Sequence, residues 1–407
     1  MAAESTRLHA RWVFSVDDDP IQDGTVEIDG GRIAGVHGTF TSNAHDLGNV
    51  ALIPGLVNAH SHLEFSDITQ PLEPSELFAD WLRALVRHRR NRSESVVNTI
   101  NHGFRESARS GTTLIGEIAT DGWSPDAFAD LGPRMVVFRE LIGLPKEQLT
   151  EQLMLARKHL EQVEQDKRSN LVRGLSPHAA YSVHPELFDW LVDLAFQSNV
   201  PVAVHLAETT AELQLLKNGT GPLVELMRDY NVWSDSAIPR FAKPLNYIKP
   251  LAKLRCALVI HGNYLDAEEI EFLAQHPWLS VIYCPRTHAY FGNSTHPWRT
   301  MLQRGVSLAI GTDSRASNPD LSIWRELLFL RERFPDVDPR ILLQLGTIRG
   351  ARALGLEIET GSLSAGKSAD LAVVELGKSA STDPYSLLFD RSSRIVATMR
   401  AGHWFDH

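Results

Sequence analysis

Two histidines separated by one residue give the strongest chemical signal in the chain. His60 and His62 end the apolar run PGLVNAHSH, residues 54–62, which has the composition of a buried strand. Residues two apart in a β-strand point to the same side, so both imidazoles can face one interior and bind one metal ion. Because isolated His-x-His pairs are common, this pair needs further ligands before it predicts a site.

Three more side chains of ligand type stand at the ends of separate apolar runs. His205 follows VPVAV, His261 follows CALVI, and Asp313 lies in AIGTDS. When parallel strands close into a barrel, their carboxyl ends meet at one face, where the active sites of such barrels are built. The alternative for either histidine alone is a buried imidazole that is hydrogen-bonded to the backbone. Together, the five residues predict a catalytic metal site.

Such a site needs a scaffold of parallel strands, and the chain offers eight candidates. Short apolar runs alternate with helix-period stretches such as SELFADWLRALVRHRR and PELFDWLVDLAFQ. Apolar runs of this kind are typical of parallel strands that are buried on both faces. Eight such units predict a (β/α)₈ barrel. The runs are VNAHSH, TTLIGEI, MVVFREL, LVRGLSPH, VPVAVHLAE, CALVIHG, LSVIYCP and VSLAIGT.

Both ends of the chain have the pattern of short strands. GTVEIDGGRIAGVHG alternates apolar and polar residues around a Gly-Gly turn, as a hairpin does, and GSLSAGKSADLAVVEL and RIVATMRAGHWF contain short strands separated by glycine turns. We therefore predict an α/β fold with two parts. A small β-sandwich domain is built from residues 1–53 and 356–407, and a metal-dependent (β/α)₈ TIM barrel of residues 54–355 is inserted between them.

Charge limits the partners of the protein. The 407 residues carry a formal net charge of −10, which argues against nucleic acid, because binding to nucleic acid depends on clustered Lys and Arg that neutralise phosphates. We interpret the one basic run, RHRR at residues 87–90 with Arg92, as the solvated face of a helix.

The sequence also shows no pattern that predicts a membrane span, secretion or a set of disulfide bonds. No apolar run approaches the roughly 18 residues of a membrane span, so no membrane partner is expected. The N-terminus lacks the pattern of a secretory signal. Cys256 and Cys284 are the two cysteines of the chain and cannot form a disulfide framework, which fits a reducing cytoplasm. We expect a cytoplasmic protein that acts on a small-molecule substrate, and we keep a homodimer open.

Five segments carry a family resemblance. PGLVNAHSHLE, SPHAAYSV, HLAET, VIHGNYL and GTDS follow one another along the chain. In this order they resemble the amidohydrolase superfamily, in its cytosine, guanine and adenosylhomocysteine deaminase-like branch, over nearly the whole sequence. The resemblance implies a mononuclear site with His60, His62, His205 and Asp313 as metal ligands. It places His261 beside the metal, touching the bound water or the substrate.

One departure bears on the number of metal ions. Members with two metals carry a bridging carboxylated Lys at the end of strand 4, where this chain has His178, and this favours one metal. Imidazole and carboxylate ligands favour Zn²⁺, although Fe²⁺ binds the same set. Such an ion lowers the pKa of its water toward neutrality. Asp313 can then accept the water's proton, and His261 can orient the nucleophile.

Glu208 is the candidate proton shuttle. It lies three residues after His205, within reach of a substrate heteroatom. The resembling deaminases use the glutamate of an HxxE segment to deliver a proton to a ring nitrogen before ammonia leaves. The alternative is an exposed acid in the first turn of a helix that only complements the helix dipole.

Five further residues are predicted to contact the substrate. His178 follows the fourth strand, where adenosylhomocysteine deaminase-like enzymes have a substrate-contacting histidine. Glu64 lies two residues after the His-x-His pair and can continue toward the pocket. Arg286, His288 and Arg315 lie just beyond strands 7 and 8, where a guanidinium group could grip an anionic substrate tail. The alternative for the arginines is pairing with loop carboxylates that stiffen the rim.

The leading hypothesis is a metal-dependent hydrolytic deaminase of an aminated purine nucleoside or related heterocycle. Aminodeoxyfutalosine comes first, because it joins an adenine ring to a benzoate that an arginine could meet, and adenosylhomocysteine or methylthioadenosine comes next. One alternative keeps the metal but hydrolyses a cyclic amide, an imidazolone or a triazine C–N or C–Cl bond. A second alternative is a non-catalytic amidohydrolase-like scaffold.

Overall fold

The computed structural model describes residues 6–38, 43–125, 128, 132–161, 171–378 and 381–405. The predicted small domain also includes residues 1–5, 39–42, 379–380 and 406–407, which lie outside the described residues. Among the described residues, no helix combines the length and the apolar character needed to cross a bilayer. Cys256 and Cys284 are both free thiols.

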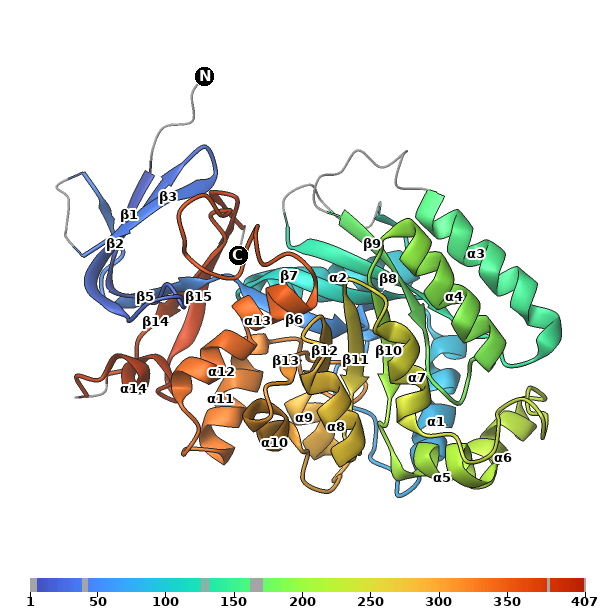
Figure 1. The fold of residues 1–407 in the computed structure, drawn as a ribbon. Helices are drawn as coiled ribbons and strands as arrows, with labels where there is room; N and C mark the ends of the chain where they lie inside the picture. The colour runs from blue at the N-terminus through green and yellow to red at the C-terminus, as the bar shows by residue number, and fades with distance from the viewer. Residues whose placement is uncertain are drawn as a thin grey trace.

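A sheet of eight parallel strands forms the centre of the molecule, as predicted (Figure 1). The strands follow one another in chain order, and nearly every residue in them is buried, which explains their continuous apolar composition. They are β6 (Leu56–Ser61), β7 (Thr112–Ala119), β8 (Arg134–Leu141), β9 (Leu171–Pro177), β10 (Val202–Leu206), β11 (Ala257–His261), β12 (Leu279–Tyr283) and β13 (Ser307–Ile310).

The first and last strands of this sheet meet and nearly close the barrel. Ser61 forms a parallel bridge with Asp313, and the amide of Asp313 donates to the carbonyl of His60 at 3.1 Å. A Cβ on Gly311 would lie only 2.8 Å from the backbone oxygen and the Cβ of His60, so the close approach requires glycine. Closure of the barrel therefore brings Asp313 to the His-x-His pair.

Helices surround the barrel and connect its strands (Figure 1). They are α1 (Phe78–Asn91), α2 (Val96–Arg109), α3 (Leu149–Glu161), α4 (Pro185–Ser198), α5 (Thr210–Asn218), α6 (Pro222–Asp229), α7 (Pro244–Leu251), α8 (Ala267–Ala274), α9 (Pro285–Tyr290), α10 (Trp298–Gln303), α11 (Ile323–Arg333), α12 (Pro339–Leu345) and α13 (Ile348–Ala353), with short 3₁₀ turns η1 (Leu63–Phe65) and η3 (Lys146–Gln148). A further helix, α14 (Pro384–Leu388), lies in the C-terminal flank.

Both ends of the chain share a second, mixed sheet at one side of the barrel (Figure 1). Its order is β16-β15-β14-β5-β1-β2-β3, with β4 paired to β1, and its side chains enclose a separate apolar core. The strands are β1 (Thr6–Val13), β2 (Ile21–Asp29), β3 (Arg32–His37), β4 (His45–Asp46), β5 (Val50–Pro54), β14 (Leu371–Glu375), β15 (Arg394–Arg400) and β16 (His403–Trp404).

The pairing of β5 with β14 joins the two flanks directly. This arrangement agrees with the predicted small β-sandwich built from both chain ends. We propose domain boundaries at residues 53/54 and 355/356. The end of β5 at Pro54, the start of β6 at Leu56 and the end of α13 at Ala353 support them.

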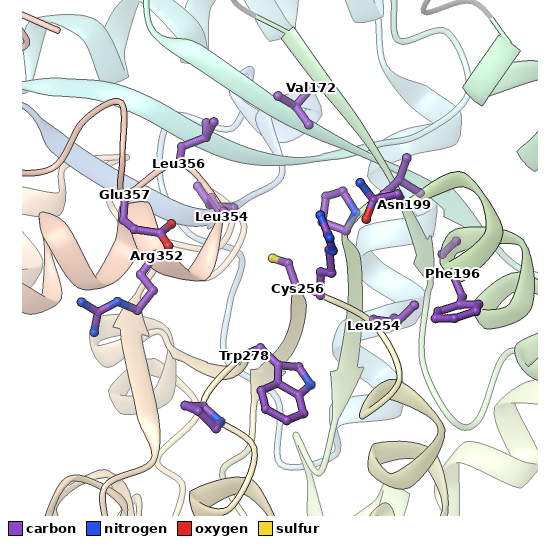
Figure 2. A pocket seen from close by; sticks show the side chains of 16 residues that line it. Val172, Phe196, Asn199, Leu254, Cys256, Trp278, Arg352, Leu354, Leu356 and Glu357 are labelled. Carbon is purple, nitrogen blue, oxygen red and sulfur yellow. The ribbon is translucent and has the colours of Figure 1, made fainter. Parts of the chain in front are cut away.

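The barrel has a cavity of about 720 Å³ at the end where its strands begin (Figure 2). Cys256 and Trp278, which directly precede β11 and β12, line it together with Phe196 and Leu354. The predicted metal ligands lie at the other end of the same strands.

Candidate metal centre

Five side chains of ligand type converge where the barrel strands end. Two groups of three share His60, and within each group the ligand atoms lie within 4.8 Å of one another: His60 with His205 and His261, and His60 with His62 and Asp313. The Nε2 atoms of His62 and His205 are 3.3 Å apart. Asp313 Oδ1 lies 3.6 Å from Nε2 of His60 and 3.7 Å from Nε2 of His62. The structure therefore brings together the whole predicted set.

The backbone is strained where two of these side chains are presented. His261 has φ of 68° and Asp313 has φ of 60°, in the left-handed region that non-glycine residues rarely adopt. Such conformations persist only where the surrounding structure enforces them, and they cluster at functional sites. His261 is the last residue of β11, and Asp313 lies three residues after the end of β13.

The histidine nitrogens fit a cation. His60 is 1% exposed, and neither of its ring nitrogens has a hydrogen-bond partner. Nδ1 of His205 donates to the carbonyl of His178 at 3.0 Å, which leaves Nε2 as a free lone pair directed at the cluster. A buried imidazole without a partner is costly unless something else satisfies it. Imidazole and carboxylate ligands in this number match a divalent cation such as Zn²⁺.

Burial keeps the imidazoles in the neutral form that binds metal. It lowers the pKa of His60 and of His261 to about 3. It also holds the pKa values of His62 and His205 well below the usual range, with neighbouring histidines adding to the effect. The pKa of Asp313 is raised by burial, although His261 and His205 oppose the shift. A cation would relieve this desolvated carboxylate.

Asp313 is oriented by its own loop. The amide of Ser314 donates to Oδ1 at 2.8 Å, and the hydroxyl of Ser317 lies 3.4 Å from Oδ2. Behind this loop, Asn318 donates to the carbonyl of Thr312 at 2.7 Å. The carboxylate is thus fixed before any ligand arrives.

Glu208 lies beside the cluster and is buried, which excludes the alternative of an exposed helix acid. It is 7% exposed, and its Oε1 is 3.5 Å from Nε2 of His261. Burial raises the pKa of Glu208 well above its usual range, and Asp313 and Glu212 raise it further. This shift favours the protonated form of the carboxyl group, which is the form that a proton donor needs.

His178 also reaches the cluster. Its ring centroid is 5.1 Å from that of His205, its Nδ1 is 2.6 Å from the hydroxyl of Ser182, and its Nε2 is 3.9 Å from Glu140. Its exposed edge borders the metal ligands, where a substrate ring would lie. The predicted substrate contact of His178 is compatible with this position and stays a prediction.

The structure pairs Arg286 and Arg315 with carboxylates, as in the alternative to a contact with an anionic substrate tail. Arg286 binds Glu326 at 2.7 Å and both oxygens of Asp320 at 2.6 and 3.0 Å. Arg315 binds both oxygens of Glu106 at 2.8 and 2.9 Å. Arg315 also donates to the carbonyls of residues 68 and 69. All three guanidinium nitrogens of each arginine are therefore engaged in hydrogen bonds. This pairing favours the alternative, and a contact of either arginine with the substrate stays a prediction.

Residues 51–405 match the family model described as "Amidohydrolase family". The chain belongs to the amidohydrolase family. It is 28% identical to an aminodeoxyfutalosine deaminase of Deinococcus radiodurans, over 77% of this chain and 75% of that protein. It is also 28% identical to a 5-methylthioadenosine/S-adenosylhomocysteine deaminase of Pyrococcus furiosus, over 88% and 81% of the two chains.

A solved structure supports the fold of this amidohydrolase. An adenosine deaminase from Xanthomonas campestris with bound zinc superposes with a TM-score of 0.78, at 24% identity, over 98% of this chain and 92% of that chain. The predictions of an amidohydrolase-type metal-dependent hydrolase and of its barrel fold are confirmed. The predicted deaminase activity agrees with the names of these relatives.

Two other predicted contacts of the amidohydrolase lie farther from the metal ligands. Glu64 is 2% exposed and binds Arg89 at 2.6 Å, so its carboxylate is already neutralised. His288 is buried behind His261, and its ring lies 5.4 Å from that of His296, which donates to the carbonyl of His261 at 2.8 Å. His288 therefore supports the wall of the site, and a direct substrate contact by either residue stays a prediction.

Three buried glutamates of the amidohydrolase were missed from the sequence. Glu117, at the end of β7, accepts from the hydroxyl of Ser61 at 2.7 Å and from the amide of Leu63 at 3.0 Å, and so fixes the backbone on both sides of His62. Glu212 accepts from the amides of residues 207 and 208 at 3.0 and 2.9 Å. Glu140 ends β8 beside His178.

The sequence contains patterns that could have identified these three glutamates. Glu117 and Glu140 are charged residues inside otherwise apolar runs, where a carboxylate is rarely buried without a role. Glu212 stands three residues after Thr209, whose hydroxyl accepts from its amide at 3.2 Å, the spacing of a helix N-terminal cap.

Proposed function

We propose that this amidohydrolase removes the exocyclic amino group of an adenosine-like purine nucleoside by hydrolysis. The observation that carries the proposal is the position of the buried Glu208, 3.5 Å from His261 and beside the cluster of candidate metal ligands, where burial raises the pKa of its carboxyl group. Deamination of a purine needs such an acid, because protonation of the ring nitrogen makes the neighbouring amino-bearing carbon electrophilic. Relatives named for aminodeoxyfutalosine and for methylthioadenosine and adenosylhomocysteine support the choice of substrate class.

The metal ligands in this proposal are His60, His62, His205 and Asp313. Zn²⁺ is the preferred ion because its ligand preferences match three imidazoles and a carboxylate. When bound, the ion lowers the pKa of a water molecule so that a nucleophile is available at neutral pH.

The chain's own residues then move the protons. Glu208 protonates a ring nitrogen and makes the amino-bearing carbon electrophilic, while Asp313 accepts a proton from the attacking water. His261, held by the hydrogen bond that its carbonyl accepts from His296, orients the nucleophile. Asp313 passes the proton from water to the amino group, the C–N bond breaks and ammonia leaves. The remaining hydroxyl proton returns to Glu208 as the ring carbon becomes a carbonyl. One water is consumed for each ammonia released.

The test is ammonia release by the zinc-loaded protein from aminodeoxyfutalosine, S-adenosylhomocysteine, 5-methylthioadenosine, adenosine, guanine and cytosine. We expect turnover of the nucleosides and none of the bare bases. Silence across this panel with metal bound would contradict the proposal and favour hydrolysis of a cyclic amide, imidazolone or triazine. A non-catalytic scaffold does not fit a family member that keeps the complete ligand cluster.

A further inference from the structure

A second pocket, of about 500 Å³, lies next to the candidate metal centre, to which it is linked through Glu140 and His178. Its walls come from α1 and from the ends of β7 and β8, and they include Glu64, Arg89, Arg139 and Glu140. Glu140 lies 3.9 Å from His178, whose ring in turn lies 5.1 Å from His205. The pocket is therefore positioned to receive the part of a substrate that extends away from the reacting ring.

Arg89 presents an open hydrogen-bonding edge to this pocket. Its Nε and Nη2 donate to the two oxygens of Glu64 at 3.2 and 2.6 Å, and its guanidinium carbon lies 5.2 Å from the centre of the Phe65 ring. Within the described chain, no hydrogen bond uses its Nη1. The side chain is 39% exposed, so a ligand can reach this edge.

The neighbouring Arg92 makes Arg89 free to act on a ligand. Arg92 is 4% exposed, donates to the carbonyl of Glu64 at 2.5 Å, and lies 3.5 Å from its carboxylate. Glu64 thus keeps a buried cationic neighbour even when Arg89 shares its charge with a ligand. Arg286 has no such freedom, since its side chain is 13% exposed and all three of its nitrogens are engaged.

Glu140, near the end of β8, also lines this pocket. Burial raises the pKa of Glu140 to about 7, with Arg89 opposing the shift and Glu64 adding to it. At neutral pH this carboxyl group therefore carries less than a full negative charge. Arg139 on the same wall donates to the carbonyl of Thr120 at 2.8 Å and pairs with Asp121.

We propose that Arg89 determines specificity by binding a carboxylate on the part of the nucleoside that is remote from the purine ring. The open edge of a guanidinium group matches a carboxylate in geometry and charge. This inference rests on the proposed function and deepens it. It also corrects the interpretation of the basic run on α1 as a purely solvated face, because Arg89 and Arg92 turn toward Glu64.

The experiment compares aminodeoxyfutalosine with its methyl ester, which removes only the charge, and with neutral 5-methylthioadenosine. For Arg89→Met we expect KM for the free acid to rise about 10–100-fold, because a charge-assisted hydrogen bond is lost. The value of kcat should stay nearly unchanged. KM for the ester and for 5-methylthioadenosine should stay at the wild-type value. Arg89→Lys, which keeps the charge but not the planar edge, should restore part of the loss.

Arg87→Met is the matched control, because Arg87 is an exposed arginine on the same helix outside the pocket lining. It should leave all three KM values unchanged. Equal increases for acid and ester in Arg89→Met, or no increase for either, would overturn the inference. If the wild type releases no ammonia from any of the three compounds, the proposed function fails instead. In that case the Kd values of the acid and the ester are measured for the wild type and for Arg89→Met. The same ratio of ester Kd to acid Kd in both proteins would overturn the proposed role of Arg89.

Discussion

Strands β10 and β11 end at one face of the barrel on His205 and His261, and they begin at the other face beside the cavity shown in Figure 2. The first face gathers buried imidazoles and carboxylates with shifted pKa values and left-handed backbone at His261 and Asp313. The second face has a roomy cavity of about 720 Å³ with largely apolar walls. Its Cys256 thiol is unreactive, because burial raises its pKa to about 12.

The two faces therefore differ in the chemistry of the side chains that they gather. Buried ionisable groups that converge from several strands indicate a functional site. Burying each of them costs free energy, and this cost is offset when the group binds a ligand or takes part in catalysis. The ends where barrel strands begin usually serve stability, and the ends where they finish serve function. Three substitutions can break or sharpen this comparison between the two faces.

Asp313→Ala should have the largest effect. The change removes a proposed metal ligand and the proposed proton acceptor, and loss of the acceptor alone costs about 10²–10⁴-fold in rate. The pKa of Asp313 is raised by burial, so its charge does not stabilise the fold, and the thermal unfolding curve should stay close to that of the wild type. Ammonia release, metal analysis and circular dichroism check these outcomes. A wild-type rate would remove Asp313 from the mechanism.

Glu208→Gln should have an intermediate effect. The amide keeps the size of the side chain but cannot deliver a proton, so kcat should fall about 10²–10⁴-fold. Metal content should be unchanged, because Glu208 is not among the proposed ligands. Steady-state kinetics with adenosine, together with metal analysis, separates the two properties. Unchanged kinetics would contradict the role of Glu208 as the proton donor.

Trp278→Ala, at the opposite face, should have the smallest effect on catalysis. Trp278 is 42% exposed and donates to the carbonyl of Ala252 at 2.9 Å, so its loss should cost about 1–2 kcal/mol of unfolding free energy. Both kcat and KM should stay at the wild-type values, because the cavity lies at the far end of the strands. Chemical denaturation and ammonia release measure the two quantities. A selective loss of activity in a well-folded variant would show that the cavity serves function after all.

The sequence by itself determined the scaffold and the set of candidate metal ligands. Apolar runs identified the eight barrel strands, and the position of His60, His62, His205, His261 and Asp313 at the ends of such runs was enough to predict their convergence. Local pattern suffices here because the geometry of a parallel barrel brings all strand ends to one face, whatever the loops do.

Only the tertiary structure decided which charges are available to a ligand. Arg286 and Arg315 lie close to the predicted site in sequence, yet Asp320, Glu326 and Glu106 occupy their guanidinium groups. Arg89 lies in a run with the pattern of a solvated helix face, yet it reaches the pocket. These partners come from other helices and loops, up to 209 residues away in the chain for Arg315 and Glu106. Pairing depends on how the connecting segments pack, and no local pattern encodes that packing.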